Sequence, residues 1–137
     1  MKLAQVTEGF AVSPQLRPEE LQQLAQGGYT TVICNRPDGE DPDQPTVEAM
    51  RSAAEAAGIA FHHIPVSGGT FPPAAIRAFA QVRKGAEGKV LAYCRTGTRS
   101  ITLDALANTE QLTTDERIGR AKMAGYDLAA MRDKLTQ

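Results

Sequence analysis

The sequence has no long apolar run, no excess of one charge and too few cysteines for a disulfide framework. Its 15 lysines and arginines nearly balance its 16 aspartates and glutamates, which gives a net charge of −1. Because no long run carries a single sign of charge, we expect no nucleic acid and no membrane as partners. No stretch of about 18 apolar residues could form a transmembrane helix. The N-terminal residues also lack an apolar segment of signal-peptide length, which favours a cytoplasmic location.

The chain also lacks the pattern of a metal site. The adjacent histidines His62 and His63 alternate across a predicted strand, so their rings face opposite sides. Since no third ligand follows at a suitable spacing, we predict no metal and no cofactor. The only two cysteines, Cys34 and Cys94, are more typical of reactive or buried thiols than of a disulfide scaffold.

Strand and helix patterns alternate along the chain, and no repeat or linker divides residues 1–137, so we predict a single domain. Strands are predicted at 4–12 (one or two short strands), 29–34, 59–64 and 89–93, and helices at 18–26, 46–57, 70–84, from about 100, 114–124 and 128–135. This alternation predicts an α/β fold with a mainly parallel central sheet of four to five strands, flanked by helices.

In a parallel sheet the active site lies beyond the carboxyl ends of the strands. That rule gathers three segments at one edge: Asn35-Arg36, residues 65–69 and the loop that begins at Cys94. The segment 35–45 carries prolines, a glycine and four acids, and we interpret it as a solvated surface turn.

The loop after the predicted strand 89–93 carries the clearest chemical signal. Its order is cysteine, a glycine turn, an arginine and then a helix, in Cys94, Gly97 and Arg99. Backbone N–H groups of such a turn form an anion-binding nest, and the helix dipole adds positive potential. A thiol in that environment is present largely as its thiolate at neutral pH. We predict that Cys94 is a catalytic nucleophile and that Arg99 binds two oxygens of an oxyanion.

The remaining residues of this segment are predicted to complete an anion-binding loop: Arg95, Thr96, Gly97, Thr98 and Ser100. Arg95 adds positive charge beside the thiol, and the Ser100 hydroxyl is expected to turn back towards the thiolate. The alternative is a structural cysteine at a strand end, because free cysteines are often buried.

Two residues of the neighbouring strand end are candidates for a supporting role. Arg36 is expected either to approach the anion from its own loop or to remain a solvated arginine paired with nearby acids. Cys34 is either a small core residue or a thiol that could form a disulfide with an oxidised Cys94.

The loop resembles the active-site loop of single-domain rhodaneses, which are sulfurtransferases. Nearly the whole chain is similar to another family, the bacterial phosphatase-like domain associated with metallo-β-lactamase-fold hydrolases, also described as a sulfur transferase family. That resemblance rests on the segments 33–40, 63–66, 93–100 and 124–128. It implies a fold similar to that of the dual-specificity phosphatases.

Two features separate sulfur transfer from phosphate hydrolysis. Cysteine phosphatases place five residues between the cysteine and the arginine, whereas four separate Cys94 from Arg99, as in rhodaneses. Phosphatases also protonate the leaving group with an upstream acid, and the loop 66–70 contains none. Sulfur transfer needs no such acid, because sulfite leaves unaided.

The sequence therefore predicts a rhodanese-like sulfurtransferase that forms a Cys94 persulfide. The expected ligand is a small sulfur-containing anion or persulfide, such as thiosulfate. The resemblance implies a persulfide dioxygenase or a sulfide-oxidising enzyme as a partner. A cysteine-dependent phosphatase that forms a Cys94 phosphocysteine is the alternative hypothesis, and a non-catalytic anion-binding partner module is a third.

Overall fold

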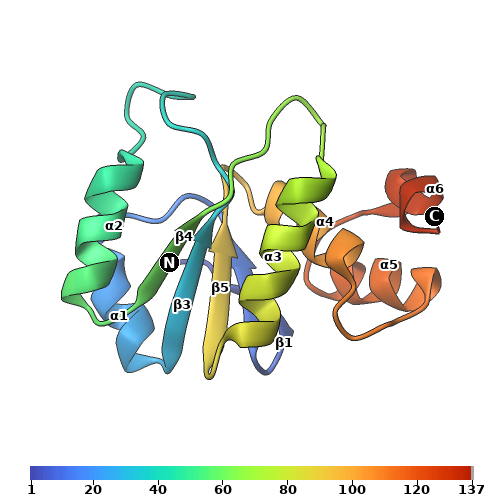
Figure 1. Ribbon diagram of the computed structural model, residues 1–137, viewed down its shortest axis with the longest axis horizontal. Helices are drawn as coiled ribbons and strands as arrows, with labels where there is room; N and C mark the ends of the chain where they lie inside the picture. The colour runs from blue at the N-terminus through green and yellow to red at the C-terminus, as the bar shows by residue number, and fades with distance from the viewer. Residues whose placement is uncertain (137) are drawn as a thin grey trace.

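The computed structural model describes residues 1–136, which form an α/β fold around a mixed five-stranded sheet (Figure 1). The strands lie in the order β1-β2-β5-β3-β4. Only β1 is antiparallel to its neighbour, and the other strands are parallel. Their bounds are β1 Ala4–Thr7, β2 Phe10–Ser13, β3 Tyr29–Cys34, β4 Ala60–His63 and β5 Lys89–Tyr93.

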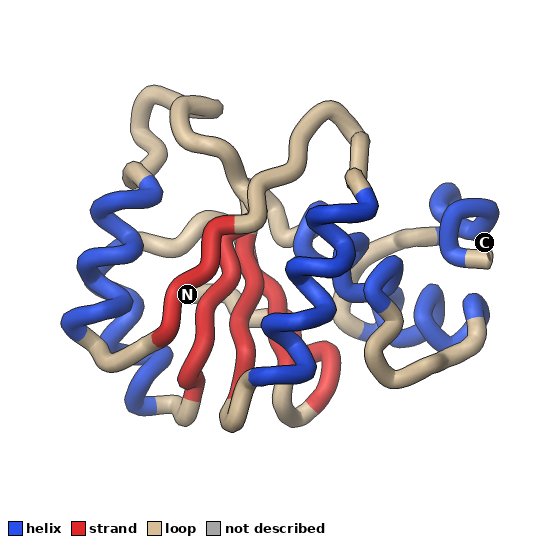
Figure 2. The backbone as a smooth tube through the Cα atoms, viewed as in Figure 1, coloured by secondary structure: helices blue, strands red, loops and turns tan. Residues whose placement is uncertain are grey.

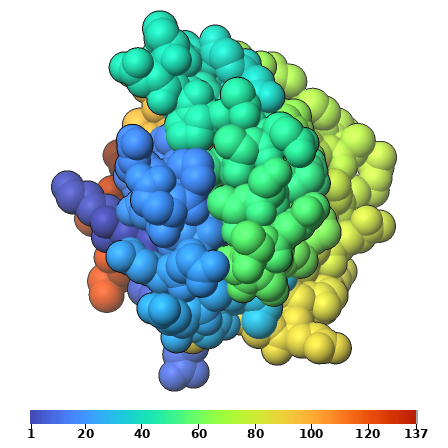
Figure 3. Space-filling view, turned by 90° about the vertical axis from the view of Figure 1, so that its left-hand side faces the viewer, coloured from blue at the N-terminus to red at the C-terminus, as the bar shows by residue number. Residues whose placement is uncertain are grey.

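Helices cover both faces of this sheet (Figure 2). The short 3₁₀ helix η1 and helices α1 and α2 lie over one face, where α1 and α2 form the blue and green layers of Figure 3. The remaining helices lie on the other side. Their bounds are η1 Pro18–Glu20, α1 Leu21–Gln26, α2 Val47–Ala56, α3 Pro73–Gly85, α4 Thr98–Ala107, α5 Thr114–Met123, η2 Ala129–Met131 and α6 Arg132–Leu135.

The inner strands β2, β3 and β5 are mostly buried on both faces, because helices cover both sides of the sheet. Along β5, Val90 and Ala92 join the core under α3 and α4, whereas Leu91 and Tyr93 join the core under α1 and α2. This alternation follows from the two-residue period of a strand. The central strand β5 is thereby packed on both faces. It ends directly before Cys94, so this packing fixes the position at which the Cys94 loop begins.

The predicted fold class is confirmed, with differences at several element ends. Helix α3 begins at Pro73 instead of Thr70, because Pro72 is extended and caps the helix. Helix α4 begins at Thr98, two residues earlier than expected. The last predicted helix is divided into η2 and α6.

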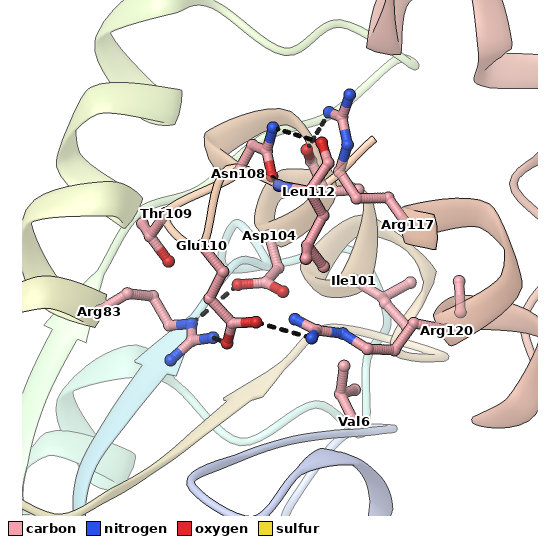
Figure 4. Close-up of a pocket in the computed structure, with 12 residues that line it drawn as sticks. Val6, Arg83, Ile101, Asp104, Asn108, Thr109, Glu110, Leu112, Arg117 and Arg120 are labelled. Carbon is pink, nitrogen blue, oxygen red and sulfur yellow. Dashed lines mark hydrogen bonds and ion pairs between the residues drawn. The ribbon is translucent and has the colours of Figure 1, made fainter. Parts of the chain in front are cut away.

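A buried ion pair joins α3 to the C-terminal half of α4 (Figure 4). Arg83 Nε donates to Asp104 Oδ1 at 2.8 Å, and both side chains are about nine-tenths buried. The Arg83 guanidinium lies 4.1 Å from the centre of the Phe10 ring, and its Nη2 is 3.9 Å from Glu110. Glu110 in turn accepts a bond from Arg120 of α5. These contacts connect α3, α4 and α5 in one cluster.

The carboxyl ends of β3, β4 and β5 lie at one edge of the sheet, at the top of Figure 1, and the loops that follow these strands gather above it. No helix among residues 1–136 is long and apolar enough to cross a membrane.

Candidate active site

Cys94 lies directly after the central strand β5 and is almost fully buried, with an exposure of 1%. Its Sγ accepts a hydrogen bond from the backbone N–H of Gly97 at 3.0 Å. Gly97 has φ +96°, a left-handed conformation that glycine adopts without steric cost, and it is followed at once by α4. The sulfur therefore faces the interior of a tight loop at the N-terminus of a buried helix, where the helix dipole favours negative charge.

Arg99, in the first turn of α4, reaches across the edge of the sheet. Its Nη1 donates to Glu40 Oε2 at 2.8 Å and to the carbonyl oxygen of Val66 at 2.9 Å, and its Nη2 donates to Glu40 Oε1 at 2.9 Å. These bonds join the loops that follow β3, β4 and β5. Hydrogen bonds that Arg99 donates to Glu40 raise the pKa of Arg99, and the nearby Cys94 sulfur acts in the same direction.

Glu40 is shared between two arginines. Its Oε1 accepts from Arg36 Nε at 2.8 Å as well as from Arg99. The hydrogen bond from Arg99 is the main cause that lowers the pKa of Glu40 from 4.5 to about 2, while burial opposes the change. Glu40 is consequently a carboxylate at neutral pH, and it holds Arg99 in a fixed direction.

Arg36 is buried, with 2% exposure, which differs from the solvated arginine considered above. Its Nη1 donates to Gln15 Oε1 at 2.9 Å and its Nη2 donates to Asp41. All three guanidinium nitrogens are thus bonded within the protein. Arg36 contacts Glu40 but has no nitrogen left without a partner, so its position suits support of Glu40 better than contact with an anion.

Cys34 lies in the core under α1 and α2. Its Sγ donates to the carbonyl oxygen of Arg36 at 3.4 Å, and burial raises the pKa of the Cys34 thiol. Both Cys34 and Cys94 are free thiols in the described residues. This position agrees with the interpretation of Cys34 as a small core residue.

Ser100 does not have the expected contact. It is fully buried, and its hydroxyl donates to Asn35 Oδ1 at 2.8 Å instead of turning to the thiolate. Asn35 Nδ2 donates in turn to the carbonyl oxygen of Ile64 at 2.9 Å. The prediction for Ser100 was wrong because a buried amide oxygen from the loop after β3 needs a donor.

The other loop residues lie at the surface of the site. Thr96 and Thr98 share a hydroxyl hydrogen bond of 3.1 Å, and Arg95 is exposed with its Nε 3.7 Å from Asp41. The carbonyl oxygen of Arg95 accepts from the backbone N–H of Gln15 at 3.3 Å. The structure thus brings the whole predicted loop, together with Arg36 and Cys34, to one edge of the sheet.

The segment 35–45 is a surface loop, as predicted, and its residues 38–40, 42 and 43 are exposed. It also contributes Glu40 to the site, through the hydrogen bonds from Arg99. The Gln44 side chain accepts from the backbone N–H groups of Glu40 and Asp41 and donates to the carbonyl oxygen of Pro37. Asp38 accepts from the N–H of Val47 at the start of α2. The sequence contained a signal for ion pairs between this loop and the site, because four acids follow a strand at the same edge of the sheet as three arginines.

Tyr126 is a further neighbour of the loop that was not identified from the sequence. Its hydroxyl donates to the carbonyl oxygen of Thr96 at 2.8 Å. Within residues 1–136, no group of three or more His, Cys, Asp and Glu side chains is arranged to hold a metal ion.

Comparison with known proteins shows which family has this architecture. The family model of the phosphatase-like domain of beta-lactamase hydrolase-like proteins matches residues 2–111. The chain belongs to this family. A beta-lactamase hydrolase-like protein of Agrobacterium fabrum is 40% identical over 134 residues, which are 95% of the chain and 31% of that protein. The chain therefore spans about a third of the length of the curated relatives it matches.

Solved structures of phosphatase-like proteins have the same fold. The family domain superposes on a Neisseria meningitidis protein, described as a "putative phosphatase", with a TM-score of 0.86 and 39% identity over 98% of this chain and 96% of that one. The active form of Tk-PTP matches with a TM-score of 0.70 and 21% identity over 97% of this chain and 92% of that one, which shows a shared fold.

Membership of a phosphatase-like family contradicts the sulfurtransferase hypothesis, and the rhodanese-like description of the loop has no support among these relatives. The spacing argument was wrong because a chain with four residues between Cys94 and Arg99 belongs to a phosphatase-like family. The lack of an acid in the loop after β4 does not exclude phosphate hydrolysis, because an ester with an acidic leaving group needs no proton donor. The expected sulfur-handling partner protein stays a prediction that no observation tests.

Proposed function

We propose that the chain is a cysteine-dependent phosphatase with Cys94 as the nucleophile. The observation that carries the proposal is the Gly97 N–H directed at the buried Cys94 sulfur, at the N-terminus of α4, in a member of a phosphatase-like family. A backbone donor and a helix dipole at this point stabilise a thiolate and also the oxygens of a bound phosphate.

In the proposed reaction the Cys94 thiolate attacks the phosphorus of a phosphate monoester. The S–P bond forms as the bond between phosphorus and the leaving oxygen breaks, and that oxygen takes its proton from water. A second water then attacks the phosphocysteine, the S–P bond breaks, and inorganic phosphate and the thiolate are released. The loop N–H groups hold the equatorial oxygens in both steps.

Arg99 is the proposed clamp for the phosphate. A guanidinium carries five N–H donors, and the bonds to Glu40 and Val66 use three of them. The Nε donor and one donor of Nη2 are therefore available to an oxyanion. Glu40 would stay in place as the carboxylate that orients Arg99, since Arg36 balances part of its charge.

The leaving group is expected to be an acidic alcohol, such as a phenol. Glu40 is ionised at neutral pH and the loop 66–70 contains no acid, so neither can protonate a poor leaving group. A groove of about 400 Å³ adjoins Arg99 through Val66, and its other walls are neutral: Pro37, Pro65, Ser67, Thr70 and Pro72. Its proline rings suit the flat face of an aromatic ring.

The test is steady-state hydrolysis of an aryl phosphate and of an alkyl phosphate by the purified protein. We expect turnover of the aryl phosphate, at least about 100-fold slower turnover of the alkyl phosphate without general-acid help, and none by Cys94→Ser. Cys34→Ala is the matched control, because it removes the other thiol and should keep the activity. Wild-type protein that releases no phosphate from the aryl ester, or Cys94→Ser that retains activity, would overturn the proposal.

A further inference from the structure

Tyr126 joins the C-terminal part of the chain to the loop that carries Cys94. It follows α5, beyond the residues that the family model matches. Its side chain is half-buried, and its hydroxyl donates to the carbonyl oxygen of Thr96 at 2.8 Å. Burial raises the pKa of Tyr126, and the nearby Cys94 sulfur raises it further, so the hydroxyl keeps its proton at neutral pH.

The Thr96 carbonyl that accepts this bond belongs to the same peptide unit as the N–H group that donates to Cys94. Thr96 C=O and Gly97 N–H are the two polar groups of one peptide unit, and no cis peptide bond occurs in the described residues. In a planar trans peptide the C=O and the N–H point in opposite directions. A bond that fixes the Thr96 carbonyl on one side therefore fixes the direction of the Gly97 N–H on the other, where it donates to Cys94 Sγ at 3.0 Å.

The space around Gly97 shows how closely the Tyr126 hydroxyl packs against the Thr96–Gly97 peptide. A Cβ atom at this position would overlap the Tyr126 hydroxyl oxygen and approach the Ser13 carbonyl oxygen to 3.3 Å. The residue also has φ +96°, which strains any other amino acid. The loop thus has a glycine at the one point where the tyrosine hydroxyl contacts the backbone, and this contact would not exist with a larger residue.

We propose that Tyr126 is a positioning residue for the nucleophile: its hydroxyl holds the Thr96–Gly97 peptide so that the Gly97 N–H donates to the Cys94 thiolate. The inference rests on the proposed function only in taking Cys94 as the reactive group. Without this hydroxyl the peptide can rotate, and the thiolate loses one charge-assisted hydrogen bond. A bond of that kind contributes about 1.5 to 3 kcal/mol, which corresponds to about a tenfold or greater change in the ionisation constant of the thiol.

The test compares Tyr126→Phe with Tyr29→Phe. The first variant keeps the ring and removes the hydroxyl, and the second does the same at the start of β3, at the opposite edge of the sheet. The rate constant for alkylation of Cys94 by iodoacetamide is measured from pH 5 to 9, with Cys34→Ala as the background so that one thiol reacts. Ionisable side chains near the sulfur include Arg99 and, in the wild type, Cys34. Arg95 follows Cys94 in the chain and has Asp41 as its neighbour, and Glu40 is bonded to Arg99.

For Tyr126→Phe we expect the midpoint of the pH profile to move upward by about one pH unit, and the rate at pH values below the wild-type midpoint to fall about tenfold. For Tyr29→Phe we expect an unchanged profile. A merely structural role of Tyr126 would lower the melting temperature but leave the midpoint in place, and that outcome overturns the inference. Alkylation needs no substrate, so a shifted midpoint supports the inference even if no phosphate ester is hydrolysed.

A measurement on the wild type keeps the inference testable should Tyr126→Phe fail to fold. Amide hydrogen exchange of Gly97, followed by NMR, is expected to be strongly protected, because this N–H is bonded to the sulfur and its peptide is held by Tyr126. Exchange at the rate of an unstructured glycine would show that the peptide is not held, and it would overturn the inference.

Discussion

At the scale of single residues, Glu40 accounts for the charge balance of the site. It accepts hydrogen bonds from Arg36 and Arg99, two guanidinium groups that would otherwise lie beside each other with only partial compensation. The bonds to Glu40 and Val66 leave the Nε donor and one Nη2 donor of Arg99 without these partners. In the proposed function, a bound phosphate would add negative charge next to Glu40, and the two arginines and the α4 dipole would offset that charge.

Glu40 makes stability depend on pH in a defined range. Because the pKa of Glu40 is lowered from 4.5 to about 2 in the folded protein, its stabilising contribution is complete above about pH 4.5 and is lost as the pH falls towards 2. We expect Glu40→Gln to lower the free energy of unfolding by about 1 kcal/mol at pH 7, since its partial exposure screens the pairs. The measurement is urea denaturation of both proteins at several pH values.

The difference between wild type and Glu40→Gln should shrink below pH 4.5 and vanish near pH 2. Glu87→Gln is the control, because Glu87 lies exposed in the turn before β5 at the opposite edge of the sheet. A difference that persists unchanged down to pH 2 would contradict a role for the Glu40 charge. The aryl phosphatase activity of Glu40→Gln should also fall, because Arg99 is then free to turn away from the loop.

At the scale of elements, α4 is the most constrained helix of the structure. Six of its residues are buried: Ser100, Ile101, Thr102, Leu103, Asp104 and Ala105. Ser100 bonds to Asn35 at its first turn, and Asp104 bonds to Arg83 of α3 towards its end. Because α4 is held near both ends, the position of the loop before it is fixed, and this explains how the backbone N–H of Gly97 can be directed at the Cys94 sulfur.

We expect Asp104→Asn to destabilise the fold by about 3 kcal/mol, because it leaves the buried Arg83 charge without its main partner. Urea denaturation at pH 7 measures the change. Asp115→Asn is the matched control, because the pair between Asp115 and Arg132 joins exposed side chains and should contribute less than about 1 kcal/mol. Equal losses in the two variants would show that burial of the Arg83–Asp104 pair has no special weight.

At the scale of the whole molecule, the C-terminal helices are part of the same core as the sheet. Ala121, Leu128 and Leu135 belong to the core cluster that contains Phe10 and Val90. Arg117 of α5 also donates to the carbonyl oxygens of Ala105 and Leu135, both at 2.7 Å. The residues beyond the family-model match therefore complete the fold and also supply Tyr126.

A chain that ends after Gln111 is expected to lose cooperative unfolding. Removal of Leu128 and Leu135 alone costs about 4 kcal/mol of apolar burial, a large fraction of the about 5 to 15 kcal/mol that stabilises a small domain. Thermal unfolding followed by circular dichroism measures the loss. A truncated chain with a sharp transition and wild-type alkylation of Cys94 would show that these helices are dispensable for both fold and site.

Local patterns were sufficient to predict much of this protein. The β-branched run 29–34 predicted β3, and the order of cysteine, glycine and arginine after β5 predicted an anion-binding loop. The alternation of strands and helices predicted the parallel sheet and the edge where the loops gather. These features depend on neighbours in the chain, so their physical cause is present in the sequence itself.

Contacts between distant segments had to come from the tertiary structure. No spacing rule relates Glu40 to Arg99, Ser100 to Asn35 or Tyr126 to Thr96, because each pair meets only after the sheet has brought separate loops to one edge. The sequence by itself determined that Cys94 stands in a tight loop between a strand and a helix. The tertiary structure decided which side chains orient that loop, because the direction of a guanidinium or a hydroxyl is set by its partners in space.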